Sequence, residues 1–223
     1  MPRWRRASKR NLGGRTFHRH YHRNMRGATG IDGESLDIRI VTAAYHEAGH
    51  VVVAAALGLR LRSEGIMVGQ DGMGLACYWK EPDGTDPSVE CNILASFAGF
   101  CAEKRLRSMR GFQTLNYFGV IFSTDWKEAR ALQPKFSSSY FGKKNIQTIH
   151  DELEARAEQL IVQYWHAIEV LAEALLNRDW EPKKIFQSGT QWSEAEEAKY
   201  VPGAEIVRIL QSAGIPAQSI RTI

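Results

Sequence analysis

The sequence predicts a mainly α-helical fold with a small β-hairpin. Residues 86–107 and 147–177 carry apolar side chains at the three- and four-residue spacing of one helix face, and residues 42–57 contain an unbroken apolar run. Between residues 60 and 80, short β-like pieces flank a turn signal. With 223 residues, of which 43% are hydrophobic, the chain is long enough for one globular domain with a substantial core.

The first predicted helix spans residues 42–57. Thr42 is a suitable N-cap, and Gly58 follows the apolar run as a residue that can end a helix. The motif His-Glu-Ala-Gly-His lies on this helix, with His46 and His50 four residues apart. Side chains at this spacing share one helix face, so both imidazoles can reach a single ion.

This motif predicts a zinc-dependent hydrolytic centre. Zn²⁺ binds imidazole nitrogen readily, and two His with one further protein ligand leave a coordination position for water. Glu47 is close enough to that water to accept its proton and later to pass it to a leaving amine. Chance alone can place two His and a Glu on one helix, but three ionisable side chains on an apolar helix are costly unless something pairs with them. We therefore expect one Zn²⁺ per chain.

A β-hairpin and a second helix are expected next. The hairpin turns at Gln-Asp-Gly, residues 70–72, and an Asp-Pro pair at residues 86–87 marks the start of the helix. Gly99, in the middle of this helix, costs about 1 kcal/mol relative to Ala. We expect it to allow a close approach to the first helix at Ala48 and Gly49.

Further helical segments are expected in the second half of the chain. They are a short helix from Thr124 to about Leu132, the long amphipathic helix 147–177, and a piece that opens at Pro202 and runs to about Ala213. The sequence contains neither an internal repeat nor a Gly-rich phosphate-binding loop.

Charge divides the chain into three parts. Residues 1–31 hold nine of the 29 Lys and Arg and no acid, which is typical of a disordered basic arm. Residues 32–180 are expected to form one domain that includes the long helix, and residues 181–223 a short helical extension. The arm could bind nucleic acid or anionic lipid, or direct the protein to an organelle. A solvated tail is the favoured interpretation, so nucleic acid is not expected as a partner except through this arm.

The cysteines and the hydropathy favour a cytoplasmic protein. Cys77, Cys91 and Cys101 form neither a C-x-x-C pair nor an even disulfide set, which indicates buried thiols in a reducing compartment. The longest apolar run, residues 51–59, is about half as long as a membrane-spanning helix, and the start of the chain lacks a secretory signal. We therefore expect no membrane span.

Two acids are candidates for the third zinc ligand. Glu103 lies on the second predicted helix, and Asp125 lies at the start of the short helix that follows. Both also have a structural interpretation, because Asp125 can form a capping box with Glu128 and Glu103 can lie on the surface of its helix. The spacing alone does not choose between them.

The order of the motifs resembles that of the peptidase domain of FtsH-type zinc metallopeptidases. The segments AYHEAGHVVVAAALG, LASFAGFCAEKRL and FSTDWKEA follow one another as in that family, over about residues 41–177. The resemblance implies a zincin-like, FtsH-protease-like helical metallopeptidase domain. It implies Glu47 as the general base and Glu103 as a residue that orients a ligand or the fold. It also implies a set of zinc ligands, His46, His50 and Asp125.

The same resemblance suggests where a substrate binds. The implied edge strand for an extended peptide consists of Leu75, Ala76, Cys77, Tyr78 and Trp79. The chain departs from the family because it has no ATPase module or membrane anchor, and because Lys104 and Thr124 stand where the family has an acid and an Asn.

We therefore expect an ATP-independent zinc metalloendopeptidase that cleaves flexible or unfolded polypeptide. It would act alone, as a homo-oligomer, or with a separate ATPase. Two alternatives stay open. One is a zinc-stabilised binding or regulatory domain with little catalytic activity. The other is a regulatory protease that cleaves a DNA-bound repressor and finds it through the basic arm.

Overall fold

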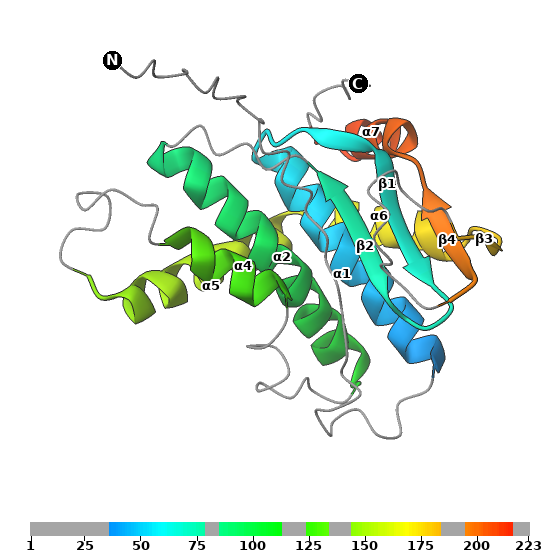
Figure 1. The fold of residues 1–223 in the computed structure, drawn as a ribbon, viewed down its shortest axis with the longest axis horizontal. Helices are drawn as coiled ribbons and strands as arrows, with labels where there is room; N and C mark the ends of the chain where they lie inside the picture. Colours follow the sequence, from blue (N-terminus) through cyan, green and yellow to red (C-terminus); the bar gives the residue numbers. More distant parts are fainter. Residues whose placement is uncertain (1–35, 79–84, 113–123, 134–143, 184–194, 216–223) are drawn as a thin grey trace, which may run out of the picture.

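The helices α1 (Leu36–Ala56) and α2 (Asp86–Arg110) pack against each other through the middle of the protein (Figure 1). The computed structural model describes five stretches of the chain, residues 36–78, 85–112, 124–133, 144–183 and 195–215. Helix α1 is buried continuously from Thr42 to Ala55, because it lies between α2, α6 and the sheet. The prediction of a mainly helical fold is confirmed.

The first helix begins earlier than predicted. It starts at Leu36, so Thr42 lies inside α1 and is not its N-cap. The Thr42 hydroxyl instead donates to the Arg39 carbonyl oxygen at 3.1 Å, within the same helix. The predicted end is confirmed, since Gly58 follows α1 in the left-handed conformation with φ 78°.

The predicted hairpin forms part of a larger sheet. Strands β1 (Leu61–Gly69) and β2 (Gly74–Tyr78) form the hairpin, and β4 (Glu197–Val201) pairs with the other side of β1. In the described part of the chain, β3 (Glu181–Pro182) completes an antiparallel sheet in the order β2-β1-β4-β3. An isolated hairpin is marginally stable, and β4 satisfies the hydrogen-bonding edge that β1 would leave open. Among the strands that the structure describes, β2 remains an edge of the sheet.

The interpretation of residues 181–223 as a short helical extension is therefore wrong in part. Helix α7 (Gly203–Ser212) follows Pro202 as predicted, but two strands of this segment belong to the same sheet as the hairpin. Because β4 pairs with β1, this segment is built into the main fold.

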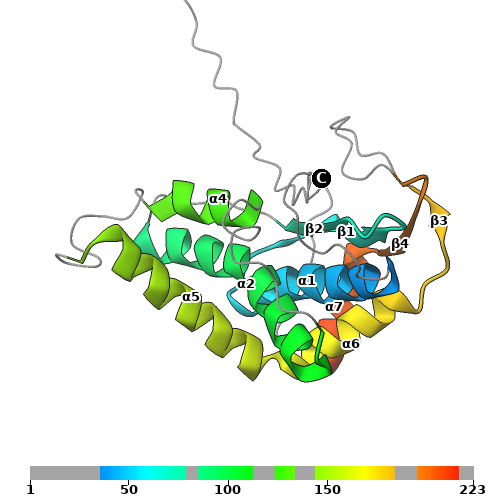
Figure 2. The same ribbon diagram turned by 90° about the horizontal axis from the view of Figure 1, so that it is seen from below.

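The long helix predicted over residues 147–177 is two helices. Helix α5 (Ile146–Gln163) ends and α6 (Trp165–Leu176) begins at Tyr164, whose backbone leaves the helical conformation at φ −104° and ψ 17°. Figure 2 shows the two helices meeting at an angle, with α5 packed on α2 and α6 packed on α1. A straight helix could not pack on both α2 and α1. The apolar pattern continues through residues 147–177 although the chain changes direction at Tyr164.

The prediction of buried thiols is confirmed for two of the three cysteines. Cys77 and Cys101 are buried and Cys91 is partly exposed, and all three are free thiols. Among the helices that the structure describes, none combines the length and the apolar character that crossing a membrane requires.

Candidate metal centre

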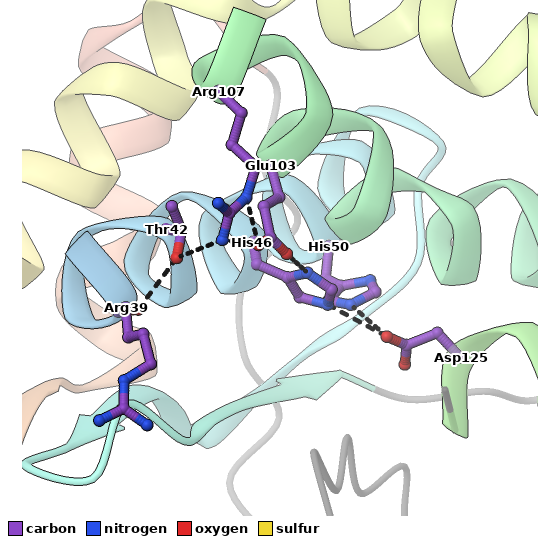
Figure 3. Close-up of polar contacts among 7 residues, drawn as sticks. All are labelled: Arg39, Thr42, His46, His50, Glu103, Arg107 and Asp125. Atoms are coloured by element: carbon purple, nitrogen blue, oxygen red, sulfur yellow. Dashed lines mark hydrogen bonds and ion pairs between the residues drawn. The ribbon is translucent and has the colours of Figure 1, made fainter. Parts of the chain in front are cut away.

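Three buried side chains from two helices converge on one point. His46 and His50 project from one face of α1, and Asp125 comes from the first turn of α4 (Thr124–Leu132). The Oδ2 atom of Asp125 lies 3.0 Å from Nε2 of His46 and 3.5 Å from Nε2 of His50 (Figure 3). Their potential ligand atoms all lie within 4.8 Å of one another. These three groups could hold a metal ion, and Asp125 rather than Glu103 is the acid that joins the two imidazoles.

The second nitrogen of each imidazole ring has its own partner. Nδ1 of His50 donates to the carbonyl oxygen of Ala95 on α2 at 2.7 Å, so Nε2 presents its lone pair to the site. Nδ1 of His46 faces Oε2 of Glu103 at 3.2 Å. These contacts fix the plane of each ring, as outer partners do for metal-ligating His. Glu103 thus lies on the side of the His46 ring away from Asp125, and its role in orienting a ligand stays a prediction.

The carboxylates around His46 control its protonation. Burial alone would lower its pKa, but the hydrogen bonds to Asp125 and Glu103 and the nearby charge of Glu47 outweigh burial, and the pKa of His46 is raised well above its usual value. Both ring nitrogens face carboxylate oxygens, an arrangement that favours the protonated form of the ring. A divalent cation at Nε2 would replace one proton between the same partners.

The donor set and the space around it fit a metal ion. A Cβ atom at Gly99 of α2 would lie 2.6 Å from Nε2 of His46 and still closer to Nε2 of His50. The absence of that side chain lets α2 pass directly beside the ligand atoms. The expected close approach of Gly99 to the first helix is confirmed, but the side chains that it faces there are His46 and His50, not Ala48 and Gly49. Gly49 instead faces Ala102, which would lie 2.7 Å from an added Cβ.

The side chain of Glu47 packs against the edge strand β2. It is completely buried, and a Cβ atom at Gly74, the first residue of β2, would lie 2.6 Å from its Cγ atom. Sequence analysis missed Gly74, although a glycine in a strand often marks a close approach. At the other end of β2, the ring of Tyr78 lies 6.5 Å from that of His50.

The predicted substrate strand is placed at the site in part. Leu75, Ala76, Cys77 and Tyr78 lie on β2, which is an edge of the sheet. Trp79 lies outside the described residues. The described part of β2 thus runs past the proposed base and one of the imidazoles.

An aromatic cluster holds α4, and with it Asp125, against the rest of the protein. The indole of Trp126 packs against the rings of Phe97 at 5.9 Å and His150 at 4.0 Å. His150 is 1% exposed, and its Nδ1 atom accepts a hydrogen bond from the Gln133 side chain at 2.8 Å. This cluster joins α2, α4 and α5, and sequence analysis did not identify it.

The protein is expected to become less stable at mildly acidic pH because of His150. Burial, assisted by the positive charge of Arg130, lowers the pKa of His150 despite the opposing charge of Asp151. The unfolded chain therefore binds this proton more readily than the folded one. The free energy of unfolding should decrease as the pH falls below about 6.5, the ordinary pKa of His, until the lowered pKa is passed.

Urea unfolding at pH 7.5 and pH 5.5 tests this expectation. The His150→Phe variant keeps the ring packing and removes the titrating group. The loss of stability between the two pH values should be smaller in the variant than in the wild type. Equal losses in the two proteins would show that His150 does not carry this pH dependence.

The chain was also compared with known proteins. It matches no protein-family model and no curated protein sequence. The resemblance to FtsH-type peptidases thus rests on the order of the motifs alone.

Proposed function

We propose that the protein is a zinc-dependent endopeptidase that hydrolyses peptide bonds in flexible or unfolded polypeptide. The convergence of His46, His50 and Asp125, with Glu47 beside them on the same helix, carries this proposal. Two imidazole nitrogens and one carboxylate oxygen suit Zn²⁺ and leave a fourth position for another ligand. When bound, Zn²⁺ would supply a Lewis acid that polarises the peptide carbonyl and lowers the pKa of water.

The side chains of the protein supply the rest of the chemistry. Glu47 follows His46 in α1, so its carboxylate is positioned to accept a proton from the attacking water and to deliver it to the leaving amine. Ala95 and Glu103 hold the two imidazoles in orientation. The edge of β2 with which no described strand pairs could bind an extended polypeptide by adding a strand, which requires a substrate that is locally unfolded. A separate ATPase could supply such a substrate, and the chain could act alone or as a homo-oligomer.

Metal analysis of an Asp125→Ala variant tests the proposal. The purified wild type should contain about one zinc ion per chain and cleave unfolded casein, and the variant should have lost both properties. Glu128→Ala, one turn along the same helix, is the matched control and should retain both. Retention of zinc by Asp125→Ala together with its loss from a Glu103→Ala variant would reassign the third ligand. Zinc and cleavage intact in every variant would reject the site.

The burial of the centre favours a second candidate, a metal-stabilised domain without turnover. The exposed fractions of His46, Glu47, His50 and Asp125 are 3%, 0%, 0% and 2%. Structural zinc sites are closed, whereas catalytic ones keep a position open to water. A protein that holds zinc, unfolds at a lower temperature after chelation, and cleaves no unfolded polypeptide would select this candidate.

A further inference from the structure

Arg107 lies on α2 one helical turn beyond Glu103 and is 2% exposed. Its Nε and Nη2 atoms both contact the same oxygen of Glu103, Oε1, each at 2.9 Å. The other oxygen, Oε2, faces Nδ1 of His46 at 3.2 Å. The two oxygens of Glu103 therefore have separate partners, one the guanidinium and one the imidazole.

The guanidinium also reaches α1 directly. Its Nη2 atom donates to the hydroxyl oxygen of Thr42 at 3.5 Å (Figure 3). That hydroxyl uses its own proton to bind the Arg39 carbonyl at 3.1 Å, so its oxygen is available as an acceptor. Thr42 lies four residues before His46 on α1, as Glu103 lies four residues before Arg107 on α2. The guanidinium thus contacts Glu103 on its own helix and Thr42 on α1, one turn before His46.

Glu47, Glu103 and Asp125 are three buried carboxylates close to one another, and each charge is costly to bury without a compensating partner. A divalent ion held by Asp125 would compensate for two of these charges, and Arg107 compensates for the charge of Glu103.

We propose that Arg107 is a positioning residue of the metal centre, which acts through Glu103 to orient the His46 imidazole toward the ion. This inference rests on the proposed function, because it concerns the same site. It differs from a purely structural role, in which Arg107 would only join α1 to α2. Under the structural role, a loss of Arg107 would lower stability and leave the bound ion unchanged.

The test compares Arg107→Met and Arg107→Lys in the full chain loaded with Zn²⁺ or Co²⁺. The Met variant should bind Zn²⁺ about 10- to 100-fold more weakly in competition with a chelator, and the visible absorption spectrum of bound Co²⁺ should change. The Lys variant, which keeps the charge and is the milder change, should recover part of the affinity. Arg105→Met is the matched control, since Arg105 lies on the same helix but stacks over Trp165. It should bind both ions as the wild type does.

A second background makes the test specific to the pathway through Glu103. In a Glu103→Gln chain, adding Arg107→Met should weaken Zn²⁺ binding less than about threefold further, because coupled residues are not additive. Equal effects of Arg107→Met in both backgrounds would overturn the inference, as would an unchanged Co²⁺ spectrum and Zn²⁺ affinity in the Met variant. Failure of the wild type to bind either ion would instead reject the proposed function. Both results are read from metal binding and do not require turnover.

Discussion

Replacing Glu47 with Gln is expected to leave zinc binding intact and to lower the cleavage of unfolded polypeptide by at least about a hundredfold. Gln has nearly the same shape as Glu, so it fits the space beside Gly74 that the missing Cβ atom leaves on β2. It cannot accept a proton from water. The effect therefore isolates the general base from the metal centre, and it corresponds to an increase of about 3 kcal/mol or more in the activation free energy.

The rate constant kcat for casein cleavage and the zinc content of the same preparation are the measurements. Glu47→Asp is an informative companion, because it keeps a carboxylate but withdraws it by one methylene group, and it should have intermediate activity. Glu158→Gln, at an exposed Glu paired with Lys104, should behave as the wild type. Wild-type turnover in Glu47→Gln would show that Glu47 is not the base. Loss of zinc from that variant would show that Glu47 holds the ion or its neighbours.

The parts of the centre that sequence analysis could predict are those encoded by local spacing. His46 and His50 share a face of one helix wherever that helix lies, so their convergence needs no tertiary information. Asp125 is separated from His46 by 79 residues, and its approach depends on how α4 packs on α2. The spacing therefore offered two acids, between which only the family resemblance chose, and the arrangement of the helices is what places Asp125 beside both rings and Glu103 behind the His46 ring.

The elements that sequence analysis missed depend on contacts between distant segments. The break at Tyr164 follows from α5 and α6 packing on different helices. Strand β4 pairs directly with β1, although the two strands lie far apart in the sequence. Two local signals were nevertheless present. The spacing of Glu103 and Arg107 is that of an intrahelical ion pair, and Gly74 stands within a strand. Neither signal predicts by itself that Glu103 contacts His46 or that Gly74 contacts Glu47, because both contacts join distant segments.

Gly99→Ala is expected to weaken zinc binding by more than about a hundredfold, because the new methyl group would occupy the space of the ligand rings. The Nε2 atoms cannot both move away easily, since Ala95 and Glu103 hold the rings by their Nδ1 atoms. This result would oppose the intrinsic preference of the helix, which favours Ala over Gly by about 1 kcal/mol. Zinc titration of the refolded or native variant, with casein cleavage in parallel, measures the loss.

Gly111→Ala is the matched control for this substitution on the same helix. Gly111 ends α2 with φ 64°, and an added Cβ atom would meet nothing within 4 Å. The control should therefore lose about 1 kcal/mol of stability, because Ala is strained in the left-handed conformation, while its zinc affinity stays unchanged. Gly111→Ala thus reports the effect of a strained backbone on stability, and Gly99→Ala reports the effect of a methyl group beside the imidazole rings on zinc affinity. If Gly99→Ala gained stability and kept its zinc, the helices would have room between them, and the rings could not be confined around an ion as proposed.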